Sequence, residues 1–173
     1  LELILVGHEP QLRAAVGKRT RPNISIVHAS EVITMSDSPM AGVRKKKDAS
    51  LLVAMRLVKQ GVADAIVSAG NTGAVMLAAR IILRQIVGVT RMPICQLMPT
   101  STGTCLVLDL GANVDCDARH LCDFAEMGVV YSQDVLGKVN PRVGLLNIGE
   151  EQAKGSEVSK SVHRTLSAAP HVN

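Results

Sequence analysis

Short apolar runs alternate with helix-like patterns along most of the chain. A run of apolar, often β-branched residues between turn residues indicates a strand, and apolar residues at every third or fourth position indicate a helix. In the segment 49–60, for example, Leu51, Leu52, Met55 and Val58 share one face of the predicted helix. The pattern predicts strands at 1–6, 24–28, 65–68, 93–98, 105–110 and 142–147, and helices at 9–16, 49–60, 71–84, 120–136 and about 156–167.

This order of elements predicts an α/β fold with a mostly parallel sheet and helices on both faces. Such sheets bind ligands at the carboxyl ends of their strands, where the strand-to-helix loops gather. No repeat, linker or low-complexity stretch marks a second domain, so a single α/β domain is expected over residues 1–173. The chain starts inside a predicted strand at Leu1 and without a methionine, so it is expected to be a piece of a longer protein.

The composition excludes several classes of protein. Hydrophobic residues make up 47% of the 173 residues and charged residues 20%, which is typical of a globular protein. Phe124 and Tyr131 are too few rings to stack nucleic-acid bases, so the net charge of +4 favours small anions or an acidic protein as partners. The four cysteines lack metal-binding spacing, which argues against a metal site and indicates a reduced cytoplasm. No cofactor is predicted. Arg80 and Arg84 interrupt the longest apolar stretch, so any membrane contact is expected to be peripheral.

The turn at 68–73 is the first candidate site. An apolar run enters a turn of Gly, Asn and Thr, and the turn opens directly onto a predicted helix. Glycine lets the backbone approach a ligand, and Asn71 or Thr72 can cap the helix while its amide N–H groups point outward. The pattern is neither a Walker A loop nor a dinucleotide fingerprint. The candidate phosphate-binding residues are Ser68, Gly70, Asn71, Thr72 and Gly73; the alternative is a tight turn whose small residues serve packing.

A basic run is the second candidate. Arg44, Lys45, Lys46 and Lys47 come immediately before the helix predicted at 49–60, which Asp48 is expected to cap. Cations beside the positive end of a helix cost a few tenths of a kcal/mol each unless an anion lies among them. The cluster therefore favours an anionic ligand or partner, with these four residues as further phosphate-binding candidates and Asp48 as a contact for substrate or carrier protein. The alternative is a solvated basic face.

Two further loops carry polar groups beyond predicted strands. Asn113 offers a donor and an acceptor that suit polarisation of a carbonyl, and Asp115 is placed to orient a base or a cation, although both residues are also suited to capping the turn. In the second loop, Asn147, Lys154 and two adjacent carboxylates follow a predicted strand. The candidate catalytic residues are Asn113, Asp115, Asn147 and Lys154, and Glu150 and Glu151 are candidate contacts for substrate or carrier protein. Cys116 lies near His120 in the sequence, which alone does not make a catalytic pair.

Four segments containing these residues resemble the PlsX-type phosphate acyltransferases of bacterial phospholipid synthesis. The segments are 32–50 (VITMSDSPMAGVRKKKDAS), 66–78 (IVSAGNTGAVMLA), 108–120 (LDLGANVDCDARH) and 141–155 (PRVGLLNIGEEQAKG). The resemblance covers essentially the whole chain and implies the central part of a longer enzyme, lacking both ends. It implies a fold similar to isocitrate and isopropylmalate dehydrogenases, a homodimer, and a cytoplasmic location with peripheral contact at the inner face of the membrane.

The reaction implied by this resemblance is transfer of a long-chain acyl group from acyl carrier protein to inorganic phosphate. Phosphate is then itself the nucleophile, so the protein must hold it near the thioester and stabilise the oxyanion. We expect the residues at 70–73 to hold phosphate with help from the basic run, Asn113 or Asn147 to donate to the carbonyl, and Lys154 to neutralise developing charge. The basic run is equally suited to docking the acidic carrier protein. The alternatives are a phosphotransacetylase acting on short-chain acyl-CoA, and a truncated domain that binds without turnover.

Overall fold

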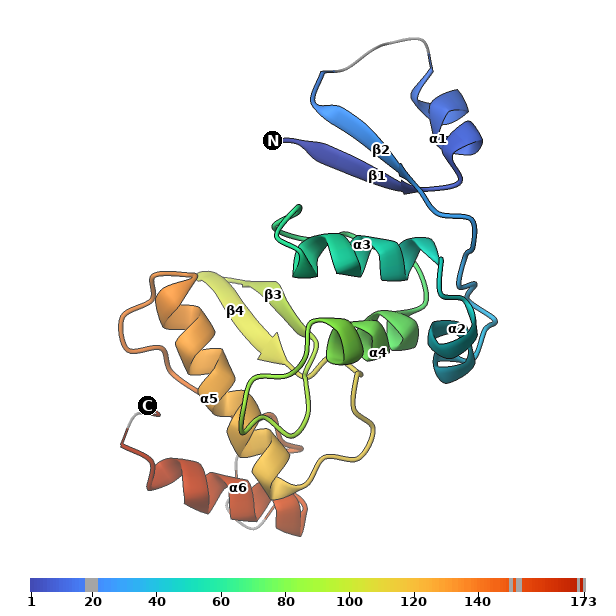
Figure 1. Ribbon diagram of the computed structural model, residues 1–173. Coiled ribbons are helices and arrows are strands. Elements are labelled where there is room, and N and C mark those ends of the chain that lie inside the picture. Colours follow the sequence, from blue (N-terminus) through green and yellow to red (C-terminus); the bar gives the residue numbers. More distant parts are fainter. Residues whose placement is uncertain (18–21, 150, 152–153, 171, 173) are drawn as a thin grey trace. The chain divides into compact units, whose positions relative to one another are not determined.

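The first two apolar runs form a parallel pair of strands with a helix between them. Strand β1 (Leu3–Gly7) pairs with β2 (Ile24–His28) in parallel, from Leu3 opposite Ile24 to Gly7 opposite His28. Helix α1 (Glu9–Val16) connects them, as parallel pairing requires a crossover. The computed structural model describes residues 1–17, 22–149, 151, 154–170 and 172 (Figure 1). These three elements confirm the strands and the helix that the sequence predicts at the start of the chain.

Three helices complete the first of two compact units, residues 1–86 and residues 87–173. They are α2 (Pro39–Lys45), α3 (Ser50–Lys59) and α4 (Thr72–Ile82). The sequence predicts α3 and α4 to within two residues at each end, but it leaves α2 as a loop. Proline in the first turn after a serine is a normal way to start a helix, and this signal is present at Ser38 and Pro39.

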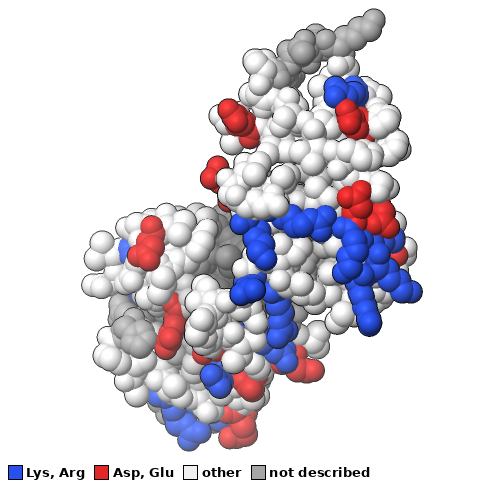
Figure 2. Space-filling view, in the orientation of Figure 1, with Lys and Arg blue, Asp and Glu red and all other residues white. Residues whose placement is uncertain are grey.

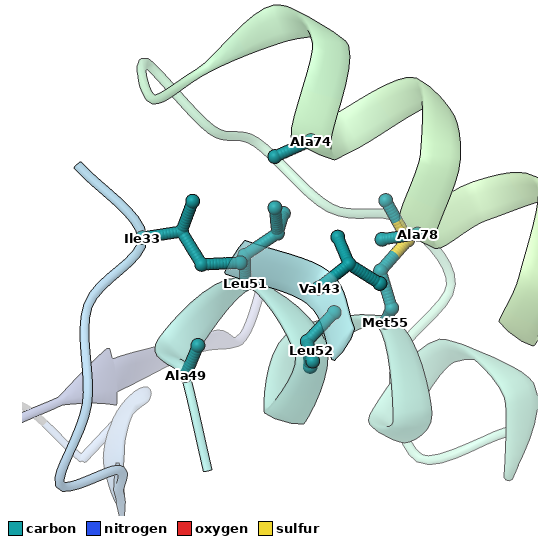
Figure 3. Packing of buried hydrophobic residues seen from close by; sticks show 8 residues of the cluster. All are labelled: Ile33, Val43, Ala49, Leu51, Leu52, Met55, Ala74 and Ala78. Carbon is teal, nitrogen blue, oxygen red and sulfur yellow. The ribbon is translucent and has the colours of Figure 1, made fainter. Parts of the chain in front are cut away.

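The core of this unit lies between α2, α3 and α4 (Figure 3). The shared face that the sequence predicts for α3 is buried here at Leu51, Leu52 and Met55, and Met55 is only 2% exposed. Ala74 and Ala78 are fully buried on α4, one turn apart, where small side chains allow the helices to pack closely. The buried cluster consists of Ile33, Val43, Ala49, Leu51, Leu52, Met55, Ala74 and Ala78.

The second unit pairs a hairpin with two helices. Strands β3 (Cys95–Thr100) and β4 (Gly103–Leu108) are antiparallel and joined by a two-residue turn. Helices α5 (Ala118–Asp134) and α6 (Glu157–Ser167) pack on each other, and α5 also contacts β4. Phe124 and Val129 on α5 and Val162 on α6 are buried. All four elements are predicted from the sequence, with ends shifted by about two residues.

The strand pairing differs from the prediction. Within the described residues there are two separate two-stranded sheets, one parallel and one antiparallel, and not one mostly parallel sheet with helices on both faces. The segments 65–68 and 142–147 form no strand, and Val67 and Leu146 are 100% and 94% exposed. An apolar run becomes a strand only when a neighbour takes up its backbone N–H and C=O groups, and neither run has such a neighbour among the described residues. The α/β class holds, while the dehydrogenase-like fold and the single domain stay predictions.

Helix length also bears on membrane contact. Among the residues that the structure describes, no helix combines the length and the apolar character needed to cross a bilayer.

Candidate functional site

Asn71 is the N-cap of α4, and its side chain is fully engaged. Its Oδ1 atom accepts a hydrogen bond from the Ala74 N–H at 3.0 Å. Its Nδ2 group donates to the backbone carbonyl oxygens of Thr34, at 3.3 Å, and Asp37, at 2.9 Å. The residue is 8% exposed. The predicted cap is therefore confirmed, and Asn71 acts by fixing the start of α4 to the loop at 34–37 rather than by offering free polar atoms.

The exposed groups of this turn lie on either side of Asn71. Among the described residues, the backbone N–H groups of Thr72 and Gly73 have no hydrogen-bond acceptor, as is usual for the first turn of a helix. The Ser68 hydroxyl accepts from the Gly70 N–H at 3.3 Å. Gly73 itself is explained by packing, because an added Cβ would lie 2.7 Å from Cγ of Pro39 at the start of α2. The turn therefore carries two backbone N–H groups without an acceptor and, at Gly73, a close contact between α4 and α2.

The basic run divides between two environments. Arg44 and Lys45 are in the last turn of α2, where the negative end of the helix favours cations. This position removes the electrostatic reason to expect an anion at Arg44 and Lys45, and phosphate binding by the basic run stays a prediction. Arg44, Lys45 and Lys47 are exposed, whereas the Lys46 Nζ donates to Asp37 Oδ2 at 2.6 Å and to the Val32 carbonyl at 2.8 Å.

Asp37 is a residue that sequence reasoning did not single out. Its Oδ2 atom accepts from Lys46, from the Thr34 N–H at 2.7 Å and from the Thr34 hydroxyl at 3.0 Å. The Lys46 hydrogen bond, followed by those from Thr34, lowers the pKa of Asp37 to about 2. Asp37 also presents its carbonyl to Asn71. The carboxylate and the carbonyl of one residue thus connect the basic run to the start of α4.

Asp48 does not cap α3. Its Oδ2 atom accepts from the hydroxyl and the N–H of Ser30, at 2.6 and 2.7 Å, and these bonds lower its pKa. The N-cap of α3 is Ala49, which makes no side-chain cap. The short parallel bridge between Glu31 and Ala49 brings Ser30 to the Asp48 carboxylate, so the predicted cap is wrong because a partner distant in sequence takes the same oxygen.

The turn after β4 is organised by Asp109. One carboxylate oxygen accepts from the N–H groups of Ile94, at 2.8 Å, and Ala112, at 3.3 Å, and the other accepts from the backbone and side chain of Asn113. Burial raises the pKa of Asp109, but the hydrogen bonds from Ile94 and Asn113 outweigh it, so the net pKa is lowered. The sequence Asp-Leu-Gly-Ala-Asn, from Asp109 to Asn113, contains a recognisable turn signal that would have identified this residue.

Asn113 has both amide hydrogens engaged. Its Nδ2 group donates to the Met92 carbonyl and to Asp109 Oδ2, each at 3.1 Å. Its use as a donor to a substrate carbonyl requires one of these bonds to be given up, whereas its Oδ1 atom accepts no hydrogen bond within the described part of the chain. Asp115 is exposed, and its backbone carbonyl accepts from Arg91 Nη1 at 2.8 Å.

Cys116 and His120 are not arranged as nucleophile and base. The His120 Nδ1 atom accepts from the Asp117 N–H at 3.2 Å, and the His120 N–H donates to Asp117 Oδ1 at 2.9 Å, which makes a capping box at the start of α5. Burial, with further contributions from nearby carboxylates, raises the pKa of the Cys116 thiol. A thiol with a raised pKa is a poor nucleophile near neutral pH.

The last loop brings three predicted residues together. The Lys154 Nζ donates to Glu151 Oε1 at 2.7 Å, and this bond lowers the pKa of Glu151. The Asn147 side chain donates to the Lys154 carbonyl at 3.3 Å. All three residues are exposed. Glu150 lies outside the described residues.

The candidate residues therefore form three local groups. One surrounds Lys46 and Asn71 in the first unit, and the others surround Asn113 and Lys154 in the second. Among the described residues, no three His, Cys, Asp or Glu side chains are close enough to hold a metal ion. The side-chain donors at the centre of these groups are already held by partners within the chain. The N–H groups of Thr72 and Gly73 have no acceptor among the described residues, and free amides at the start of a helix are suited to an anion.

Comparison with known proteins extends over the whole chain. A family model described as "Fatty acid synthesis protein" matches residues 1–173. Three relatives named "Phosphate acyltransferase" are among the most similar. The Desulforamulus reducens protein is 47% identical over 96% of this chain and 50% of its own length. Those of Heliobacterium modesticaldum and Methylococcus capsulatus are each 49% identical, over 98% and 100% of this chain and 52% of their own lengths. The chain spans about half the length of these curated relatives.

Proposed function

Because the chain belongs to the fatty acid synthesis protein family, whose model matches residues 1–173, we propose that it carries part of a phosphate acyltransferase. The observation that supports this most is identity of 47–49% across nearly all of the chain to relatives of that name. The proposed reaction moves a long-chain acyl group from acyl carrier protein to inorganic phosphate, giving an acyl phosphate for phospholipid synthesis.

In the proposed reaction phosphate is the nucleophile. A phosphate oxygen attacks the thioester carbonyl carbon, a carbon–oxygen bond forms, and the carbon–sulfur bond of the tetrahedral intermediate then breaks. The carrier thiol leaves as a thiolate and takes up a proton. No covalent enzyme intermediate is required, which agrees with the raised pKa of Cys116 and the capping role of His120. The protein contributes position and charge stabilisation.

We place phosphate at the start of α4. The N–H groups of Thr72 and Gly73 have no acceptor among the described residues and are proposed to donate to it, and the Ser68 and Thr72 hydroxyls and the Gly70 backbone are the other groups proposed to contact it. The position of this turn is fixed by Asn71 and, through Asp37, by Lys46. Asn71 and Lys46 are thus proposed as positioning residues.

The carbonyl chemistry is proposed for residues of the second unit. Asn113 and Asn147 each carry a side-chain amide that suits an oxyanion, and Lys154 carries a cation for the developing charge. Lys154 already pairs with Glu151, so the pair supplies a positioned cation. Asp115 is an exposed carboxylate two residues after Asn113 and is proposed to orient a base or a cation, and Asp48 and Glu151 remain proposed contacts for substrate or carrier protein. A homodimer, a fold like that of isocitrate dehydrogenase and peripheral contact with the inner membrane surface complete the proposal.

The test is formation of acyl phosphate, trapped with hydroxylamine. Palmitoyl acyl carrier protein and phosphate are supplied, with acetyl-CoA as the competing donor. Because the chain spans about half of its relatives, the assay is run on the chain and on a grafted enzyme, in which residues 1–173 replace the matching half of the Heliobacterium modesticaldum relative.

Product from the long-chain carrier substrate alone is expected in the grafted enzyme. Product from acetyl-CoA instead would favour a short-chain phosphotransacetylase. Absence of product from either donor, while the unmodified relative is active in the same assay, would contradict the proposal. Activity of the grafted enzyme but not of the chain would assign turnover to the longer protein.

A further inference from the structure

Arg44, Lys45 and Lys47 form a surface that we define as the basic patch. All three are exposed, and none makes an ion pair or side-chain hydrogen bond within the described residues. In Figure 2, Lys and Arg side chains gather over α2, with acidic side chains along one border of the group. The remaining member of the run, Lys46, points inward to Asp37 and is excluded from the patch.

Nearby carboxylates do not neutralise the patch by direct contact. Asp37 is held by Lys46 and Thr34, and Asp48 is held by Ser30. Glu31 accepts from the Asp48 N–H at 2.8 Å. Hydrogen bonds lower the pKa of Asp37 and of Asp48, so both carboxylates stay ionised and committed to these internal partners. The three cations of the patch therefore have no direct partner among the described residues and are available to another molecule.

The patch is shaped for a broad acidic surface rather than for one small anion. Arg44 and Lys45 are consecutive residues of a helix, so their side chains project about 100° apart. Lys47 follows the helix end, where its backbone carbonyl accepts from Arg56 Nη2 at 3.0 Å. Side chains that diverge in this way reach several carboxylates spread over a surface, whereas a bound phosphate needs donors that converge on it.

We propose that the basic patch docks the acidic surface of the carrier protein that delivers the acyl group, an inference that rests on the proposed function. In this proposal the basic run does not bind phosphate. Lys46 holds the local fold through Asp37, and the three residues of the basic patch contact the carrier protein. Charge complementarity of this kind raises the association rate and depends on salt. An anionic membrane is the less suitable occupant, because lipid-binding basic clusters contain about four to eight cations.

The experiment measures binding of fluorescently labelled acyl carrier protein to the chain by anisotropy, at about 0.01 M and about 0.15 M salt. The patch variant carries Arg44→Gln, Lys45→Gln and Lys47→Gln. The matched control carries Lys59→Gln, Arg80→Gln and Arg142→Gln, which removes the same charge at three other exposed positions. We expect the patch variant to bind about tenfold more weakly at low salt and to lose most of the salt dependence, while the control stays within about twofold of the parent.

The outcomes separate this inference from the proposed function. Equal weakening of both variants, or no weakening of either, would overturn the docking surface, and so would carrier binding that is absent altogether. Flotation with vesicles containing phosphatidylglycerol is run in parallel, and patch-dependent vesicle binding without carrier binding would assign the surface to lipid instead. Patch-dependent carrier binding without acyl phosphate from the grafted enzyme would leave the docking surface standing and contradict the proposed reaction. Turnover that is identical in all variants at a limiting concentration of carrier protein would support the proposed reaction and contradict the docking surface.

Discussion

Replacement of Asn71 tests whether the start of α4 is held by the loop at 34–37. Asn71→Ala removes the cap of the Ala74 N–H and both bonds to the carbonyls of Thr34 and Asp37. Asn71→Ser retains an oxygen for the cap but loses the two donated bonds. Thr72→Ala, at the exposed neighbouring position, is the matched control. Comparison of the three variants therefore separates the effect of the helix cap from the effect of the two hydrogen bonds to the loop at 34–37.

The expected magnitudes follow from these bonds. Loss of an N-cap costs about 1 kcal/mol, and each lost hydrogen bond costs about 0.5–1.5 kcal/mol. We expect Asn71→Ala to lower the free energy of unfolding by about 2–4 kcal/mol, and Asn71→Ser to cost about 1 kcal/mol less. Thr72→Ala is expected to change it by less than about 0.5 kcal/mol, because its side chain is exposed.

Two measurements check these values. Urea unfolding followed by far-UV circular dichroism gives the free energy, and hydrogen exchange reports the Ala74 amide directly. Protection of that amide should fall by about 30-fold or more in Asn71→Ala and by less in Asn71→Ser. The reasoning would be refuted if Asn71→Ala were no less stable than Thr72→Ala. It would also be refuted if Asn71→Ser lost Ala74 protection as completely as Asn71→Ala.

Three further predictions concern neighbouring features. Gly73→Ala should lower the free energy of unfolding by about 1–3 kcal/mol, since its Cβ would meet Pro39 Cγ at 2.7 Å; Gly70→Ala should cost less, and Pro39→Ala should rescue Gly73→Ala in thermal unfolding. Because the folded-state pKa of Asp37 is lowered to about 2, its contribution to stability is present above pH 4 and is lost as the pH falls toward 2. The urea midpoint of Asp37→Asn should therefore vary less than that of the parent between about pH 4 and pH 2. Cys116→Ser in the grafted enzyme should retain its rate of acyl phosphate formation, and a loss of more than tenfold would restore a thiol mechanism.

The helices could be predicted because their signals are local. An apolar stripe of period 3.6 and a capping side chain lie within the helix or next to it, as Leu51, Met55 and Asn71 show. Helix α2 was missed because only Gly42 and Val43 of its seven residues are buried, which is too short a stripe to recognise. The start signal of Ser38 and Pro39 was the better guide.

The strands were harder because pairing is not local. The runs at 65–68 and 142–147 also contain apolar residues, yet neither pairs with another strand within the described residues. Val67 and Leu146 stay exposed, while Ile66 packs against the core. The hairpin of β3 and β4 was predicted as two strands but not as an antiparallel pair. Its turn, Ser101 and Thr102 before Gly103, lacks the Asn-Gly or Asp-Gly signature that marks a hairpin.

The candidate site residues show the same difference between local contacts, which the sequence predicts, and contacts between distant residues, which it does not. Asn147 and Lys154 were expected together because they lie in one loop, and the structure joins them. Asp37 was missed, since its importance comes from Lys46, nine residues later, and from Asn71, 34 residues later. A carboxylate in a polar loop gives no sequence signal of such partners.

The basic run shows why residue type alone does not assign function. Four cations in succession look equivalent in the sequence, but α2 ends within them, and the chain leaves the helix at Lys46 with φ −91° and ψ 75°. This change of direction lets the Lys46 Nζ reach Asp37 Oδ2 while its neighbours stay exposed. Removing all four charges together would mix a loss of fold with a loss of binding. Lys46 must be changed separately, and only the three outward residues can report on a partner.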